Sequence, residues 1–188
     1  MLTAGFAQRC TGGWIAALRG MSRQRQRLHI GIALCAIGLC SAPAQSREAA
    51  AAPPPAASAF AAAVVDLTNV ERTLQQRQPL RANVRLMRAA QIHAEQMARA
   101  RQMAHVLPNA AYPSAEDRLA AAEYRWQTYG ENVAAGQTTA TEVLNDWMHS
   151  RGHRTNILNP DFTEMGAGYA IDRDGRAYHV QVFGGPLS

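Results

Sequence analysis

The 188-residue chain contains no lysine, so all 19 of its basic residues are arginine. Its three cysteines are Cys10, Cys35 and Cys40, all close to the N-terminus. A protein cleaved after residue 44 would contain no cysteine, which excludes disulfides, a thiol nucleophile and a cysteine-ligated zinc site. Its stability must then come from packing or from a metal ion. The hydrophobic fraction of 47% excludes a wholly disordered chain.

Acidic residues are absent from the first 47 positions, whereas five arginines precede residue 45. From residue 45 onward, 14 arginines are balanced by 14 acidic residues. The formal charge of +5 therefore belongs to the N-terminal segment alone. The later arginines are scattered among the acids, which argues against a nucleic-acid-binding face.

The N-terminal charge pattern is typical of an export signal. Met21 begins a short segment with three arginines, and 13 mostly apolar residues follow at 28–40. Ala42 and Ala44 then fit the small-x-small pattern that precedes a cleavage site. We predict a signal peptide that ends at Ala44, so the mature protein is expected to be secreted or periplasmic.

The predicted domain boundaries follow from this signal. Residues 1–44 comprise an N-terminal extension and the signal peptide, with translation expected to start at Met21. An uncleaved anchor is the less favoured alternative, because 13 apolar residues are too few to cross a bilayer. We therefore expect no transmembrane protein after cleavage. Residues 45–58 are rich in Ala and Pro and predict a semi-rigid linker. Residues 59–188 form the folded domain.

Hydrophobic spacing predicts four helices followed by two strands. The helices are expected at 60–75, 86 to about 101, 114 to about 124 and from 139 onward, and the strands at 166–171 and 177–183. Ser114 and Thr139 each stand three residues before an acidic residue, which is typical of a capping box. Residues 172–175 favour a hairpin between the strands. This order, helices first and strands last, predicts an α+β fold.

His149 and His153 are four residues apart, the spacing of zinc-binding histidine pairs on one face of a helix. A zincin also needs a glutamate directly after the first histidine, and this position is Ser150. Gly152 is expected to end the helix just before the second histidine. We therefore interpret His149 as a residue of the helix surface and exclude a zincin site.

Glu131 stands in the sequence Gly130-Glu131-Asn132, which is expected to form a loop between two helices. A carboxylate beside a glycine in a weakly polar stretch is a candidate ligand or general base. The alternative is a buried glutamate that accepts hydrogen bonds from loop amides, and spacing alone slightly favours it. The sequence contains no nucleophile elbow, Walker loop or dinucleotide fingerprint.

Several motifs occur in a characteristic order along the domain. Residues 130–136 read Gly-Glu-Asn-Val-Ala-Ala-Gly, and residues 147–158 read Trp-Met-His-Ser-Arg-Gly-His-Arg-Thr-Asn-Ile-Leu. Residues 162–168 and 180–184 add the strand sequences that follow. This ordered set, over about residues 60–184, resembles the bacterial branch of the CAP superfamily (cysteine-rich secretory proteins, antigen five and pathogenesis-related proteins), also called the SCP domain.

The resemblance implies a three-layer α–β–α sandwich around a small, mostly antiparallel sheet. Members of the family carry a cleft with two histidines and two glutamates. Carried over by motif, these are His105, Glu131 and His153, while Ser150 stands where the second glutamate would fall. Two imidazoles and one carboxylate suit a divalent metal such as zinc, with water as the fourth ligand. The alternative is a His–Glu–His hydrogen-bond cluster without metal.

The resemblance leaves three functional hypotheses, and we favour one without catalysis. In the first, the exported domain binds an envelope ligand or partner (lipid, sterol, peptide or glycan) through its His/Glu cleft. In the second, it is a metal-assisted, peptidase-like hydrolase that uses His105, Glu131 and His153, with Glu131 as the third ligand or the base. In the third, it is a passive structural or interaction module of the envelope. We expect a monomer that binds no nucleic acid.

Overall fold

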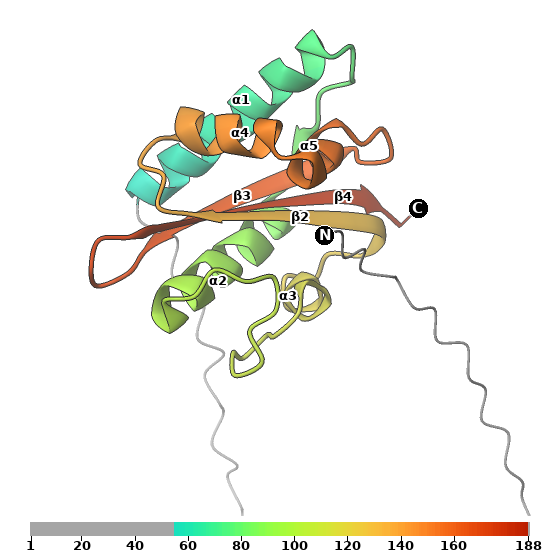
Figure 1. Ribbon diagram of the computed structural model, residues 1–188. Helices are drawn as coiled ribbons and strands as arrows, with labels where there is room; N and C mark the ends of the chain where they lie inside the picture. The colour runs from blue at the N-terminus through green and yellow to red at the C-terminus, as the bar shows by residue number, and fades with distance from the viewer. Residues whose placement is uncertain (1–54, 188) are drawn as a thin grey trace, which may run out of the picture. The chain divides into compact units, whose positions relative to one another are not determined.

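The computed structural model describes residues 55–187 (Figure 1). The predicted N-terminal extension, the signal peptide and most of the predicted linker lie outside the described residues. In the part of the chain that is described, no helix is long and apolar enough to span a membrane.

The described domain consists of helices and strands that form three layers. In chain order these are α1 (Pro55–Leu74), β1 (Arg81–Ala82), α2 (Val84–Ala100), α3 (Ala115–Ala121), β2 (Trp126–Ala135), α4 (Ala140–His149), α5 (Arg151–Leu158), β3 (Glu164–Ile171) and β4 (Ala177–Pro186). Figure 1 shows α1, α4 and α5 on one face of the sheet and α2 and α3 on the other. The predicted three-layer α–β–α sandwich is confirmed.

The four strands are arranged in the order β1-β3-β4-β2. The short strand β1 pairs in parallel with β3, whereas β3 with β4 and β4 with β2 are antiparallel. The sheet is therefore mostly antiparallel, as expected. Strand β2 lies at one edge, so helices from both layers can approach its open side.

Capping residues set the starts of two helices. The Ser114 side chain accepts a hydrogen bond from the Asp117 N–H, and the Asp117 carboxylate accepts one from the Ser114 N–H. Thr139 and Glu142 form the same reciprocal pair at the start of α4. Both predicted capping boxes are confirmed. They set the starts of α3 and α4, the two helices between which β2 lies.

Each face of the sheet carries its own buried cluster. Trp147 and Phe183 belong to the cluster under α1 and α4, and Leu86 and Tyr178 belong to the cluster under α2. Helix α2 lies directly on β3, because a Cβ atom at Gly168 would stand 2.4 Å from backbone atoms of Ala90. This close approach positions the side chains of α2 against the sheet.

The prediction of a loop around residues 130–132 is wrong, because these residues lie inside β2. Glu131 pairs with Val182 of β4, and the pairing extends along almost the whole strand. Strand-forming residues (Trp, Thr, Tyr and Val) stand on either side of the Gly-Glu-Asn triplet, but the residue types of the triplet itself are depleted in strands, so local propensity at the centre weakly favours a loop. Pairing with β4 outweighs this weak preference.

Two helix boundaries also differ from the prediction. Helix α1 begins at Pro55, inside the segment predicted as linker. Helix α4 ends at His149, because Ser150 adopts an extended conformation (φ −93°, ψ 120°), and Gly152 lies inside α5 instead of ending a helix. His149 and His153 are therefore on different helices. His149 is exposed, which confirms it as a surface residue.

Candidate functional site

Glu131 lies on β2, and charged or polar side chains from other elements cluster around its carboxylate. Its side chain is only 5% exposed, and both carboxylate oxygens have partners. Oε1 lies 2.9 Å from Nδ1 of His105, and Oε2 accepts a hydrogen bond of 2.9 Å from Nη2 of Arg118. Because an ionised carboxylate can only accept hydrogen bonds, we assign the proton of this contact to Nδ1 of His105.

Arg118 of α3 ties the segment that carries His105 to the strand that carries Glu131. Its side chain is 1% exposed. Besides Glu131, its guanidinium donates to the backbone carbonyls of Tyr112 (3.3 Å), Pro113 (3.1 Å) and His105 (3.0 Å). Four acceptors for one buried cation make a rigid junction, since removing the cation would leave all four without this donor.

The pKa of Glu131 reflects opposing effects. Burial alone would raise it, but the hydrogen bond from His105 and the charge and hydrogen bond of Arg118 outweigh burial and hold the pKa below its usual value. The carboxylate is therefore ionised at neutral pH and bound on both oxygens. This environment suits a positioning role for Glu131 better than the predicted role of general base.

His105 is the exposed member of the cluster. Its side chain is 56% exposed, and its Nε2 makes no hydrogen bond within the described residues. The hydrogen bond to Glu131 outweighs partial burial and raises the pKa of His105. The buried carboxylate thus binds Nδ1 of the imidazole, and Nε2 remains available to contact a ligand.

His153 lies near this pair but is not bonded to it. Its backbone carbonyl accepts a hydrogen bond of 3.2 Å from Asn132, and its ring stands edge-on to Trp147, with 6.5 Å between centroids. Burial and the charge of His105 lower the pKa of His153. The structure therefore joins His105 to Glu131 directly and places His153 within electrostatic reach.

The predicted three-ligand metal site does not fit this arrangement. In residues 55–187, no group of three or more His, Cys, Asp or Glu side chains is arranged to hold a metal ion. Both oxygens of Glu131 are engaged, and the guanidinium of Arg118 would repel a divalent cation at the same carboxylate. Two imidazoles remain as donors, fewer than the three protein ligands of catalytic zinc sites. We assign no chemical step to a metal.

His93 of α2 is a member of the cluster that sequence motifs do not mark. It is fully buried, and its Nε2 lies 3.6 Å from Oε1 of Glu131. Within residues 55–187, neither of its ring nitrogens has a hydrogen-bond partner of good geometry. Burial lowers the pKa of His93 to about 4, so the ring is neutral at pH 7. The sequence signal that could have identified His93 is its position on the core-facing side of a predicted helix.

The opposite face of β2 carries a polar network that holds α5. Asn132 donates to Oε1 of Gln181 at 3.1 Å, and Gln181 in turn donates to Thr68 at 2.7 Å. Asn156 of α5 donates to Oδ1 of Asn132 at 2.9 Å and to the carbonyl of Glu131 at 3.1 Å. Side chains alternate along a strand, so neighbouring residues Glu131 and Asn132 anchor elements from opposite layers.

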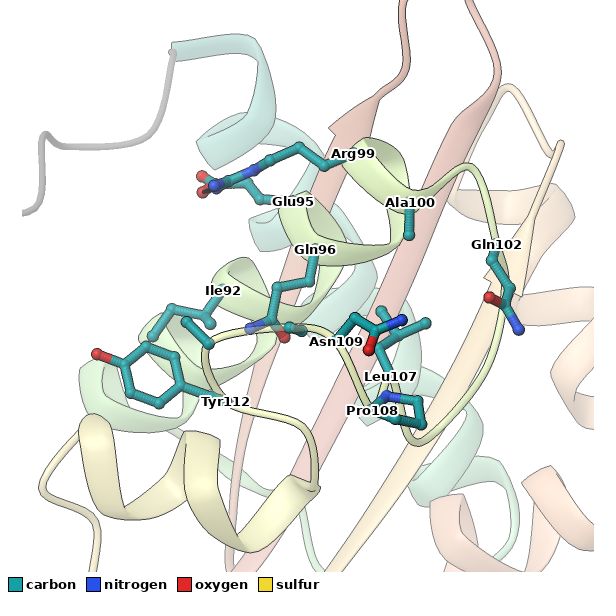
Figure 2. A pocket seen from close by; sticks show the side chains of 12 residues that line it. Ile92, Glu95, Gln96, Arg99, Ala100, Gln102, Leu107, Pro108, Asn109 and Tyr112 are labelled. Atoms are coloured by element: carbon teal, nitrogen blue, oxygen red, sulfur yellow. Dashed lines mark hydrogen bonds and ion pairs between the residues drawn. The ribbon is translucent and has the colours of Figure 1, made fainter.

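A pocket of about 530 Å³ lies between α2 and the segment 107–112 (Figure 2). Leu107 and Tyr112 contribute to one wall, and the ion pair between Glu95 and Arg99 (3.1 Å) lies on the α2 side. None of the three predicted site residues lines it. The pocket is nevertheless linked to the site, because Arg118 binds the carbonyl of Tyr112.

Comparison with known proteins identifies the class to which this domain belongs. The model of the cysteine-rich secretory protein family, CAP, matches residues 65–183, which is more than half of the chain. The chain therefore belongs to the CAP family. This result confirms the resemblance drawn from the ordered motifs.

Two relatives come from Bacillus subtilis (strain 168). The protein YkwD is 40% identical over 110 residues, which cover 58% of this chain and 42% of YkwD. The membrane protein YlbC is 32% identical over 120 residues, which cover 64% of this chain and 33% of YlbC. The match thus spans less than half the length of either relative.

A solved structure shares the fold. The crystal structure of an extracellular protein with an SCP domain from Bacillus anthracis is similar to this chain with a TM-score of 0.62 and 27% sequence identity. The match covers 71% of this chain and 44% of that protein.

Proposed function

We propose that this CAP domain is exported and binds a ligand of the cell envelope through His105, with Glu131 and Arg118 as positioning residues. The observation that carries the proposal is the contact between a buried, ionised Glu131 and an imidazole that is more than half exposed. Export is supported by the predicted signal peptide at 21–44 and by the similar protein from Bacillus anthracis, which is extracellular.

The buried pair of Glu131 and Arg118 gives His105 a defined tautomer and orientation. With Nδ1 donating to Glu131, neutral His105 offers Nε2 as an acceptor, and protonated His105 offers it as a donor. The raised pKa of His105 enlarges the protonated fraction near neutral pH. This chemistry suits a lipid, sterol, peptide or glycan that presents an oxygen atom to the imidazole. His153 would contact the same ligand from α5.

NMR spectroscopy of the mature protein with ¹³C-labelled histidine tests this proposal. The probes are dioctanoyl phosphatidylglycerol, cholesterol sulfate, a short unlabelled peptide and muramyl dipeptide. We expect saturable shifts of the His105 signals with at least one probe, and loss of the same binding in His105→Gln. The control is His149→Gln, an exposed histidine that contacts the carbonyl of Asn145. The proposal fails if no probe shifts His105, or if both variants bind as the parent protein does.

The hydrolase hypothesis keeps one supporting observation. An imidazole oriented by a carboxylate is the arrangement in which histidine acts as a general base. Zinc titration of the mature protein by calorimetry tests the metal hypothesis directly. Stoichiometric binding that is lost in His105→Ala and in His153→Ala would support a metal site. Hydrolysis of a labelled peptide that depends on both histidines would favour catalysis over simple binding.

A further inference from the structure

A groove of about 810 Å³ lies where α4 passes into α5, beside the segment that follows α1. Its lining includes Arg77, Arg151 and Arg154, all exposed, and, among residues 55–187, no aspartate or glutamate. The volume is in the range of ligand-binding pockets. This local excess of positive charge stands out, because arginines and acidic residues are equal in number from residue 45 onward.

The three arginines at the groove have no acidic partner within the described residues. None of them forms an ion pair, and Arg154 donates only to Oε1 of Gln75 at 3.1 Å. Arg151 and Arg154 are three residues apart on α5, so their side chains start from the same face of the helix. Their guanidinium groups are therefore available to bind carboxylates in two-pronged geometry.

A fourth arginine lies behind the groove. Arg72 is 1% exposed and donates to the carbonyls of Gln78 (2.8 Å), Ile157 (2.7 Å) and Asn159 (3.0 Å), but to no carboxylate of the described part of the chain. Burial and the neighbouring charge of Arg77 lower the pKa of Arg72. The carbonyls that accept from Arg72 carry no formal charge to balance it, and Asn159 also lines the groove. The positive potential of the groove is therefore reinforced from inside the protein.

The groove also has an apolar part. Met148 and Leu158 line it, and both are partly buried because they pack against the core cluster. Both are less exposed than the three arginines that line the same groove. A free phosphate would leave them uncovered. A peptide with both acidic and apolar side chains can satisfy the two parts together.

We propose that this groove binds an extended acidic segment of a partner protein. The carboxylates of the segment pair with Arg77, Arg151 and Arg154, and its apolar side chains lie on Met148 and Leu158. The site uses none of the residues of the His105 cluster. Its failure would therefore leave the proposed function untouched.

Fluorescence anisotropy with the mature protein tests the groove. The probe is a labelled ten-residue peptide of alternating Glu and Leu, and the matched control peptide alternates Gln and Leu. We expect each of Arg77→Gln, Arg151→Gln and Arg154→Gln to weaken binding about two- to fivefold, since the pairs are exposed, and the triple variant to weaken it about tenfold or more. Arg173→Gln removes the same charge from an exposed position outside the groove and should leave the affinity unchanged.

Three results would overturn the proposal. Equal binding of the two peptides would show that carboxylates are not recognised. An effect of Arg173→Gln as large as that of the triple variant would show only general attraction between charges. Arginine-dependent binding of inorganic phosphate, or of vesicles with 30% phosphatidylglycerol in phosphatidylcholine, without binding of the acidic peptide would assign the groove to a different ligand.

Discussion

Replacing Arg118 by methionine removes the buried cation that pairs with Glu131 and keeps most of the side-chain volume. The side chains of the pair are 1% and 5% exposed, so the remaining carboxylate would stay buried without the cation that binds its Oε2. Breaking a buried ion pair from one side costs about 3–5 kcal/mol. We expect a loss of that size in the free energy of unfolding, and a decrease of roughly 10–20 °C in Tm for a domain of this size.

Urea denaturation of Arg118→Met, Glu131→Gln and the double variant measures this loss. The double variant should be at least about 1 kcal/mol more stable than the sum of the single effects predicts, because it leaves no unpaired charge. Arg99→Met is the matched control, since its ion pair with Glu95 is exposed and should contribute less than about 1 kcal/mol. A loss below about 1 kcal/mol in Arg118→Met, or additive effects in the double variant, would refute the reasoning.

Three further predictions concern stability. The pKa of His93 is lowered to about 4 in the folded protein, so this histidine takes up its proton at a higher pH in the unfolded chain. We therefore expect the free energy of unfolding to fall by about 3 kcal/mol between about pH 6.5 and 4. Urea denaturation as a function of pH measures this loss, and His93→Leu should flatten that part of the profile. Gly168→Ala places a Cβ atom 2.4 Å from backbone atoms of α2 and should lower the free energy of unfolding by about 1–3 kcal/mol, measured by thermal denaturation. Gly175→Ala places its Cβ atom near no other atom and should lower it by less, despite the positive φ at this position. His153→Ala removes a side chain that makes no hydrogen bond to any described residue and should lower Tm by only a few degrees, roughly the effect of 1 kcal/mol. A larger drop would favour the hypothesis of a structural cluster.

Local signals in the sequence were sufficient for much of the fold. The capping boxes at Ser114 and Thr139 mark helix starts, and the turn at 172–175 joins β3 to β4, because these features depend on neighbouring residues. Strand β2 depends on pairing with β4, which is about 50 residues away along the chain. Its central Gly-Glu-Asn triplet consists of poor strand formers, so local propensity at these residues suggests a loop although strand-forming residues flank them.

The candidate site is predictable only in part for the same reason. Motif order points to His105 and Glu131, and the structure brings these two side chains into contact. Arg118 and His93 carry no motif. An arginine in a short helix normally faces solvent, and the burial of Arg118 follows from the position of Glu131 on a strand that local sequence does not predict.

The tautomer and pKa of His105 test the central claim most directly, and both can be measured by ¹⁵N NMR during a pH titration. We predict that neutral His105 carries its proton on Nδ1 and that its pKa lies above the usual value of about 6.5. In Glu131→Gln the pKa should fall below that value, because burial and the charge of Arg118 remain while the carboxylate is lost. A proton on Nε2, or a pKa that is the same with and without the carboxylate, would contradict the account.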